Sequence, residues 1–99
     1  MIVVDTRLDQ AGVPIITVSG ELDSSNAASL EATIAPFAAE HTDRLVFDLS
    51  ELRFMDSAGI AVLVGLTAKG NAVQLREPSQ AVRRVIELTG LSGVLPTEP

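Results

Sequence analysis

The stretch FMDSAGIAVLV, residues 54–64, places a carboxylate and a hydroxyl side by side at the point where a helix should begin. Asp56 and Ser57 follow a strand-like run and precede a wholly apolar run. A serine at a helix start can cap it, because the hydroxyl accepts a hydrogen bond from a free backbone N–H group. The same position favours phosphate, since the first amides and the helix dipole point toward it. The position of Ser57 is therefore compatible with a structural cap and with a phosphorylation site.

A nucleophilic role for Ser57 has less support. A hydrolase nucleophile is typically flanked by glycines and activated by a nearby base. Here Met55-Asp56 precede the serine, Ala58-Gly59 follow it, and the only histidine is His41. We interpret His41 as a helix-end or loop residue. We therefore expect no catalytic residues and no enzyme activity.

Composition excludes several other classes of protein. The 99 residues carry a net charge of −6 and only 3% aromatic residues, so the basic and aromatic surface of a nucleic-acid binder is missing. The absence of cysteine rules out disulfides and thiolate metal sites, and we expect neither a metal nor a cofactor. The start of the chain does not resemble a signal peptide, and no apolar run is long enough to span a membrane. We expect a single cytoplasmic domain over residues 1–99.

Hydrophobic periodicity predicts the elements that position Asp56 and Ser57. The predicted strands are 2–8, 14–18, 45–49 and 72–76, and the predicted helices begin near Ala27, Ser57 and Ser79. Pro36 should kink the first helix or end it early, and Gly90 should end the last one. The tail, residues 92–99, is expected to form a turn and a short edge strand. The fold is thus predicted to be α/β: a mixed sheet of four to five strands, in the order ββαβαβα, with helices packed on it.

The helix that begins at Ser57 is apolar on every side, whereas a surface helix normally has one polar face. A chain of this length has little protein left to cover both sides of such a helix. We therefore expect part of Ala61, Val62, Gly65 or Leu66 to be exposed. An exposed apolar patch usually marks a surface that binds a partner.

Three blocks of the sequence, in order, resemble a known family. GELD (20–23), LVFDLSELRFMDSAGI (45–60) and PSQAVRRVIELTGL (78–91) are similar to bacterial STAS domains of the anti-sigma-factor antagonist type. The match covers nearly the whole chain. Many family members have a second hydroxyl where this chain has Ala58, and the segment from Gly65 to Asn71 is about one helical turn shorter than is usual.

The resemblance implies a partner-switching regulator. The unmodified protein would bind an anti-sigma factor that is also a serine kinase, and this binding would free the sigma factor. Phosphorylation at Ser57 would release the antagonist, and a serine phosphatase would reset it. The residues expected to bind the partner are Asp23, Asp56, Ser57, Ala58, Gly59, Ala61, Val62 and Gly65.

Two questions stay open at the level of sequence. Gly59 could allow the close approach of a partner or simply pack the helix on the sheet. A non-switching STAS subunit of a transport or stress-signalling assembly would have the same motifs, with Ser57 as a cap. The oligomeric state is unknown.

Overall fold

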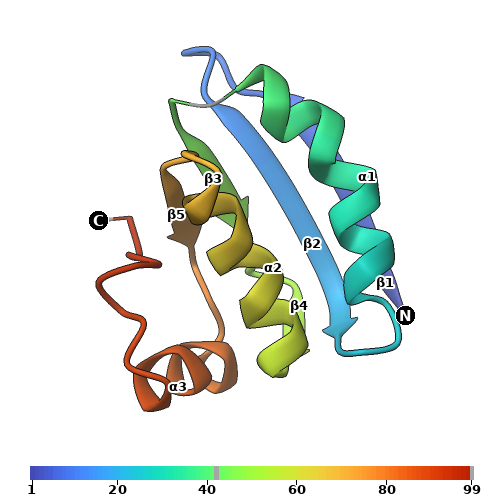
Figure 1. Ribbon diagram of the computed structural model, residues 1–99, viewed down its shortest axis with the longest axis vertical. Helices are drawn as coiled ribbons and strands as arrows, with labels where there is room; N and C mark the ends of the chain where they lie inside the picture. The colour runs from blue at the N-terminus through green and yellow to red at the C-terminus, as the bar shows by residue number, and fades with distance from the viewer. Residues whose placement is uncertain (42, 99) are drawn as a thin grey trace.

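The computed structural model describes residues 1–41 and 43–98, which form a mixed five-stranded sheet with helices packed on it (Figure 1). Strand order is β1-β2-β3-β5, and β4 pairs with β2 beyond the end of β3. The β1–β2 pair is antiparallel, and the other pairs are parallel. The elements are β1 (Ile2–Leu8), β2 (Pro14–Leu22), α1 (Ala27–Glu40), β3 (Leu45–Asp48), β4 (Leu52–Met55), α2 (Ser57–Ala68), β5 (Val73–Arg76) and α3 (Gln80–Leu88).

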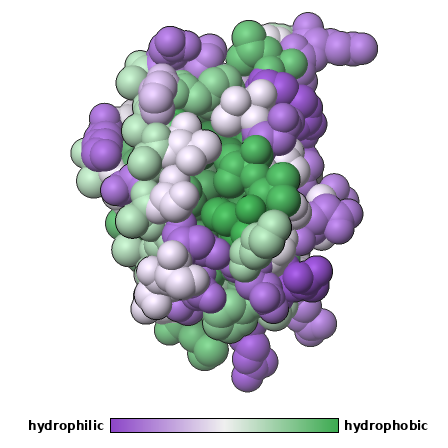
Figure 2. Space-filling model, turned by 90° about the vertical axis from the view of Figure 1, so that its right-hand side faces the viewer, coloured by the Kyte–Doolittle hydropathy of each residue, from purple (hydrophilic) through white to green (hydrophobic). Residues whose placement is uncertain are grey.

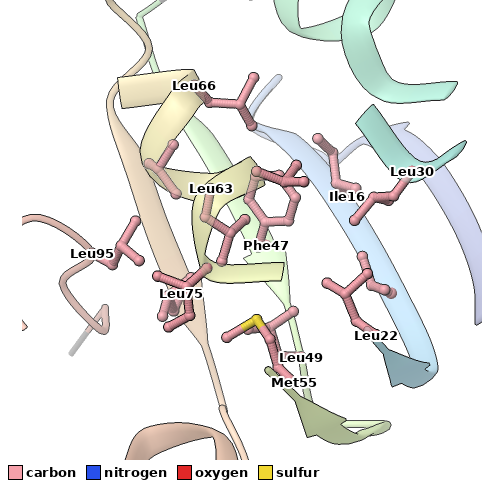
Figure 3. Close-up of a cluster of buried hydrophobic side chains, with 14 of the residues drawn as sticks. Ile16, Leu22, Leu30, Phe47, Leu49, Met55, Leu63, Leu66, Leu75 and Leu95 are labelled. Atoms are coloured by element: carbon pink, nitrogen blue, oxygen red, sulfur yellow. The ribbon is translucent and has the colours of Figure 1, made fainter. Parts of the chain in front are cut away.

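The core lies between one face of the sheet and helices α1 and α2 (Figure 3). Phe47 of β3 and Leu75 of β5 meet Leu63 of α2 there, and each of the three is at most 1% exposed. Leu95 of the C-terminal segment closes the core on the β5 side. Helix α2 lies between α1 and the C-terminal part of the chain (Figure 1), which explains why it is apolar on several sides.

The α/β class and the mixed sheet are confirmed, but the predicted order of elements omitted β4. In β4 the first and last residues are buried, whereas Arg53 and Phe54 are both exposed. This pattern does not alternate, so periodicity did not indicate a strand. Pairing with β2 supplies the backbone hydrogen bonds that hold these four residues extended.

Helix α1 does not end early at Pro36 but continues to Glu40, so of the two expected effects of the proline the early end is wrong. Pro36 is exposed. The carbonyl that loses its partner to the proline ring can therefore be hydrated, which lowers the cost of the missing hydrogen bond.

Local signals at other helix ends are confirmed. The Ser79 hydroxyl accepts a hydrogen bond from the Val82 N–H at 3.2 Å and caps α3. Gly90, with a φ of 74°, follows the last turn of α3, and the Leu91 N–H reaches the Ile86 carbonyl at 3.1 Å. This is the hydrogen-bond pattern of a Schellman motif. Where the sequence predicted a short edge strand, the tail forms only an isolated parallel bridge, Leu75 to Thr97.

Candidate functional site

The two acidic residues near Ser57 leave the sheet side by side. Strands β2 and β4 run parallel with Leu22 opposite Met55, so the next residue of each strand, Asp23 and Asp56, lies at the same end of the sheet. The Asp56 N–H donates to the Leu22 carbonyl at 3.2 Å and ties the two strand ends together. Helix α2 starts at this point, at the lower end of the molecule in Figure 1.

Asp56, not Ser57, caps helix α2. The Asp56 carboxylate accepts hydrogen bonds from the backbone N–H groups of Ala58 at 2.9 Å and Gly59 at 3.4 Å. Its own backbone is extended, as is usual for a capping residue. Ser57 is therefore the first residue inside the helix, and its side chain is exposed. The interpretation of Ser57 as a capping residue is corrected by this geometry.

Removing the Asp56 carboxylate should destabilise the protein more than removing the Ser57 hydroxyl. We expect Asp56→Ala to lower the free energy of unfolding by about 1 kcal/mol, because two amides lose their acceptor. Ser57→Ala should change it by less than about 0.5 kcal/mol, as is typical of exposed positions. Urea denaturation of both variants measures the difference. Equal losses would contradict the assignment of the cap.

Asp23 is held in a turn by its own neighbours. Its carboxylate accepts from the Ser25 hydroxyl at 2.5 Å and from the Ser25 N–H at 2.9 Å. These two hydrogen bonds, the hydroxyl first, hold the pKa of Asp23 below its ordinary value. A lowered pKa means that this group favours the folded state above its ordinary pKa and loses that contribution as the pH falls. Asp23 therefore has a structural role in the turn and stays negatively charged at neutral pH.

Gly59 packs the first turn of α2 onto the sheet. It is buried, and a Cβ atom added there would lie 2.6 Å from the Met55 Cγ atom and 2.8 Å from the Leu22 Cγ and Cδ2 atoms. Of the two interpretations of Gly59, the structure supports helix–sheet packing. Of the four residues expected to be exposed in part, Val62 and Leu66 are not, since they are only 6% and 4% exposed and belong to the core.

The exposed side of α2 is a narrow line of small residues that begins next to Ser57. Ala61 and Ala68 are exposed, and Ala58 and Gly65 are half-buried. Their spacing of three, four and three residues places them along one helix face. We call these four residues the α2 stripe. Ala68 was not among the predicted partner residues, although it continues the same helical spacing.

His41 cannot serve Ser57 as a base. It lies at the C-terminal end of α1, where its ring packs on Phe37 with the centroids 4.6 Å apart. Figure 1 shows that the end of α1 and the start of α2 lie at opposite ends of the molecule. Across residues 1–41 and 43–98, no three His, Cys, Asp or Glu side chains are grouped so that they could hold a metal ion. No helix in the described part of the chain is long and apolar enough to cross a membrane.

Comparisons with known proteins identify the family. The family model described as "Mlab, STAS domain" matches residues 6–96. The anti-sigma-F factor antagonist RsfB of Mycobacterium tuberculosis is 35% identical over 89 residues, covering 87% of this chain and 73% of that protein. The crystal structure of an anti-sigma factor antagonist from Mycobacterium paratuberculosis superposes with a TM-score of 0.87 at 33% identity, covering 100% of this chain and 86% of that one. The phosphorylated form of the Bacillus cell fate determinant SpoIIAA, at 22% identity, has the same fold with a TM-score of 0.68, over 98% of this chain and 92% of that one. With most of its length matched in both sequence and fold, the chain belongs to the STAS domain family.

Proposed function

We propose that this protein is an anti-sigma factor antagonist whose binding to its anti-sigma factor is switched off by phosphorylation at Ser57. The observation that carries the proposal is the exposed Ser57 hydroxyl beside a helix cap made by another residue, Asp56. Because capping does not occupy Ser57, its side chain is accessible to a kinase. The relatives named as anti-sigma factor antagonists support the same function.

The proposed partner surface consists of Ser57, the α2 stripe and the acidic pair Asp23 and Asp56. The small side chains of the stripe would let a partner's backbone or side chains approach the helix closely. The sequence-predicted residues Gly59 and Val62 act on this surface indirectly, by holding α2 in place from inside the core.

A phosphate on Ser57 would change both the charge and the shape of this surface. It adds nearly two negative charges next to Asp56, on a protein with a net charge of −6. Two like charges 4 Å apart repel each other by roughly 4 kcal/mol at an effective dielectric of 20. A micromolar complex is held by only about 8 kcal/mol, so even a heavily screened repulsion from an acidic partner surface would weaken it tenfold or more. Release therefore requires no large conformational change.

The cycle needs two further proteins. The anti-sigma factor would itself be the serine kinase, using ATP in the cytoplasm, and a serine phosphatase would regenerate the binding form. One structural neighbour, SpoIIAA, is described in both an unphosphorylated and a phosphorylated form, so this fold can carry the modification. The protein would bind its partner without performing catalysis itself.

Transfer of phosphate from ATP tests the proposal directly. We expect one candidate anti-sigma factor of the same organism to add a single phosphate to the protein, located at Ser57 by mass spectrometry. Ala58 leaves no second hydroxyl beside Ser57, so Ser57→Ala should accept none. The phosphorylated protein should no longer bind that anti-sigma factor in calorimetry. Phosphate elsewhere, or undiminished binding after phosphorylation, would refute the switch.

The alternative is a non-switching STAS subunit of a transport or stress-signalling assembly, which would have the same domain. In that case Ser57 would remain unmodified with every anti-sigma kinase of the organism. The protein would then be recovered from native lysate in the same assembly with or without phosphatase treatment.

The α2 stripe can be mapped with a single bulky residue. We expect Ala61→Arg to weaken binding of the anti-sigma factor at least about tenfold, since a large charged side chain would block close packing at the centre of the surface. Ala32→Arg is the matched control, because Ala32 is also an exposed alanine but lies on α1. Equal binding by both variants would exclude the α2 stripe as the contact surface.

A further inference from the structure

The two outer edges of the sheet differ. At β5, the C-terminal segment covers the edge: the Leu75 N–H donates to the Pro96 carbonyl and the Glu98 N–H donates to the Leu75 carbonyl, both at 2.8 Å. An ion pair between Arg76 and Glu98 holds this segment in place. At the opposite edge, β1 pairs with β2 on one side, and no described strand pairs with its other side. Strand β1 is therefore an open edge.

The hydrogen bonds at the two ends of β1 show which of its backbone groups face outward. The Glu21 N–H donates to the Met1 carbonyl, and the Asp9 N–H donates to the Val13 carbonyl. In an antiparallel pair, hydrogen-bonded and non-hydrogen-bonded positions alternate. The odd-numbered residues of β1 therefore bond to β2. The even-numbered residues, Ile2, Val4, Thr6 and Leu8, direct their N–H and C=O groups away from the sheet.

Strand β1 lacks two of the features that usually keep an open edge from pairing, and its two charged residues, Asp5 and Arg7, have opposite signs. It has seven residues in unbroken register with β2, with no proline and no bulge. Apolar surface gathers on this side of the molecule (Figure 2). Ile2 and Val4 are half-buried beside the core, and Leu8 is 53% exposed.

We propose that β1 pairs antiparallel with β1 of a second copy of this chain, centred on Thr6, so that one sheet runs through a symmetric dimer. In this register the outward-facing groups of even-numbered residues meet one another. Val4 lies opposite Leu8 of the second copy, and the two Thr6 residues face each other. Asp5 lies opposite Arg7 of the second copy, and the two-fold axis repeats this opposite-charge pair. Such cross-strand pairs stabilise antiparallel strands.

Electrostatic repulsion disfavours the registers centred on Asp5 or Arg7 relative to the register centred on Thr6. Centring the pair on Asp5 would place the two Asp5 side chains opposite each other, and centring it on Arg7 would do the same with the two arginines. Like charges directly opposite are destabilising. A shift of one strand by a single residue would place even positions opposite odd ones and break the hydrogen-bond ladder. Of these registers, the Thr6-centred one keeps the hydrogen-bond ladder and places Asp5 opposite Arg7 without placing like charges opposite each other.

Charge reversal tests the pairing. By sedimentation equilibrium from micromolar to millimolar concentration, we expect a concentration-dependent dimer of the wild-type protein. Asp5→Arg and Arg7→Asp should each weaken dimerisation at least about tenfold, because two attractive pairs become two repulsive ones. An equimolar mixture of the two variants should form a heterodimer, since each aspartate of one variant then lies opposite an arginine of the other. The double variant Asp5→Arg/Arg7→Asp should dimerise like the wild type.

Matched controls separate this effect from net charge. Glu87→Arg and Arg84→Asp make the same charge changes at exposed positions of α3, away from β1, and should leave dimerisation unchanged. A wild-type protein that stays monomeric throughout the range would overturn the proposal. So would single variants that still dimerise, or a mixture of the two that does not associate. Formation of the heterodimer also demonstrates that both variants are folded.

Discussion

Replacing Ser57 with aspartate is expected to weaken binding of the anti-sigma factor at least about tenfold while leaving the stability of the protein nearly unchanged. The new carboxylate would stand next to Asp56 on the proposed partner surface and imitate part of the charge of a phosphate. The helix keeps its cap, because Asp56 supplies those hydrogen bonds, and a negative charge in the first turn is favourable to the helix dipole. Ser57→Asp should therefore lower the affinity for the anti-sigma factor without lowering the free energy of unfolding.

Isothermal titration with the anti-sigma factor, together with urea denaturation, measures both quantities. Ser29→Asp is the control, because it adds the same charge at an exposed serine of α1. Ser57→Ala should bind like the wild type but should no longer be released when ATP is added. If Ser57→Asp binds as tightly as Ser29→Asp, charge at the start of α2 does not govern the interaction.

The same substitution at two glycines of α2 is expected to have opposite effects on stability. Gly59→Ala should lower the free energy of unfolding by about 1–3 kcal/mol, because its methyl group would overlap the buried Met55 and Leu22 side chains. Gly65→Ala should raise it by about 0.5–1 kcal/mol, since alanine favours the helix over glycine. At Gly65 no atom lies within 4 Å of the added Cβ.

Urea denaturation of the two variants at the same pH checks the sign of each change, and each variant serves as the control for the other. A stabilised Gly59→Ala would mean that α2 can move away from the sheet at little cost. In that case Gly59 would not be needed for packing, and a role in partner binding would again be open for it.

Much of the fold could be predicted from the sequence because the signals are local. The hydrophobic spacing in α1, the serine cap of α3 and the glycine after its last turn each depend on residues within one or two turns. The alternation of residues 2–8 likewise predicts a half-buried strand. Strand β4 was missed, since its four residues do not alternate and are held extended by pairing with β2.

At the candidate site, the local signals indicated where helix α2 begins but not which residue caps it. The sequence places Asp56 and Ser57 at a helix start, but either side chain could make the cap. The residue that makes the cap depends on how the backbone is oriented at the end of β4. The hydrogen bond from the Asp56 N–H to the Leu22 carbonyl sets this orientation. In the same way, Gly59 and Val62 face the core because of where α2 rests on the sheet.

The sequence by itself determined the α/β class, the limits of most elements and the position of a serine at the start of an apolar helix. These properties follow from periodicity and from hydrogen bonds between near neighbours. The tertiary structure alone decided that Asp56 is the cap, that His41 lies at the far end of the molecule, and that β1 leaves one edge of the sheet open. Each of these depends on contacts between segments far apart in the chain, and the sequence pattern of one segment does not specify which distant segment covers it.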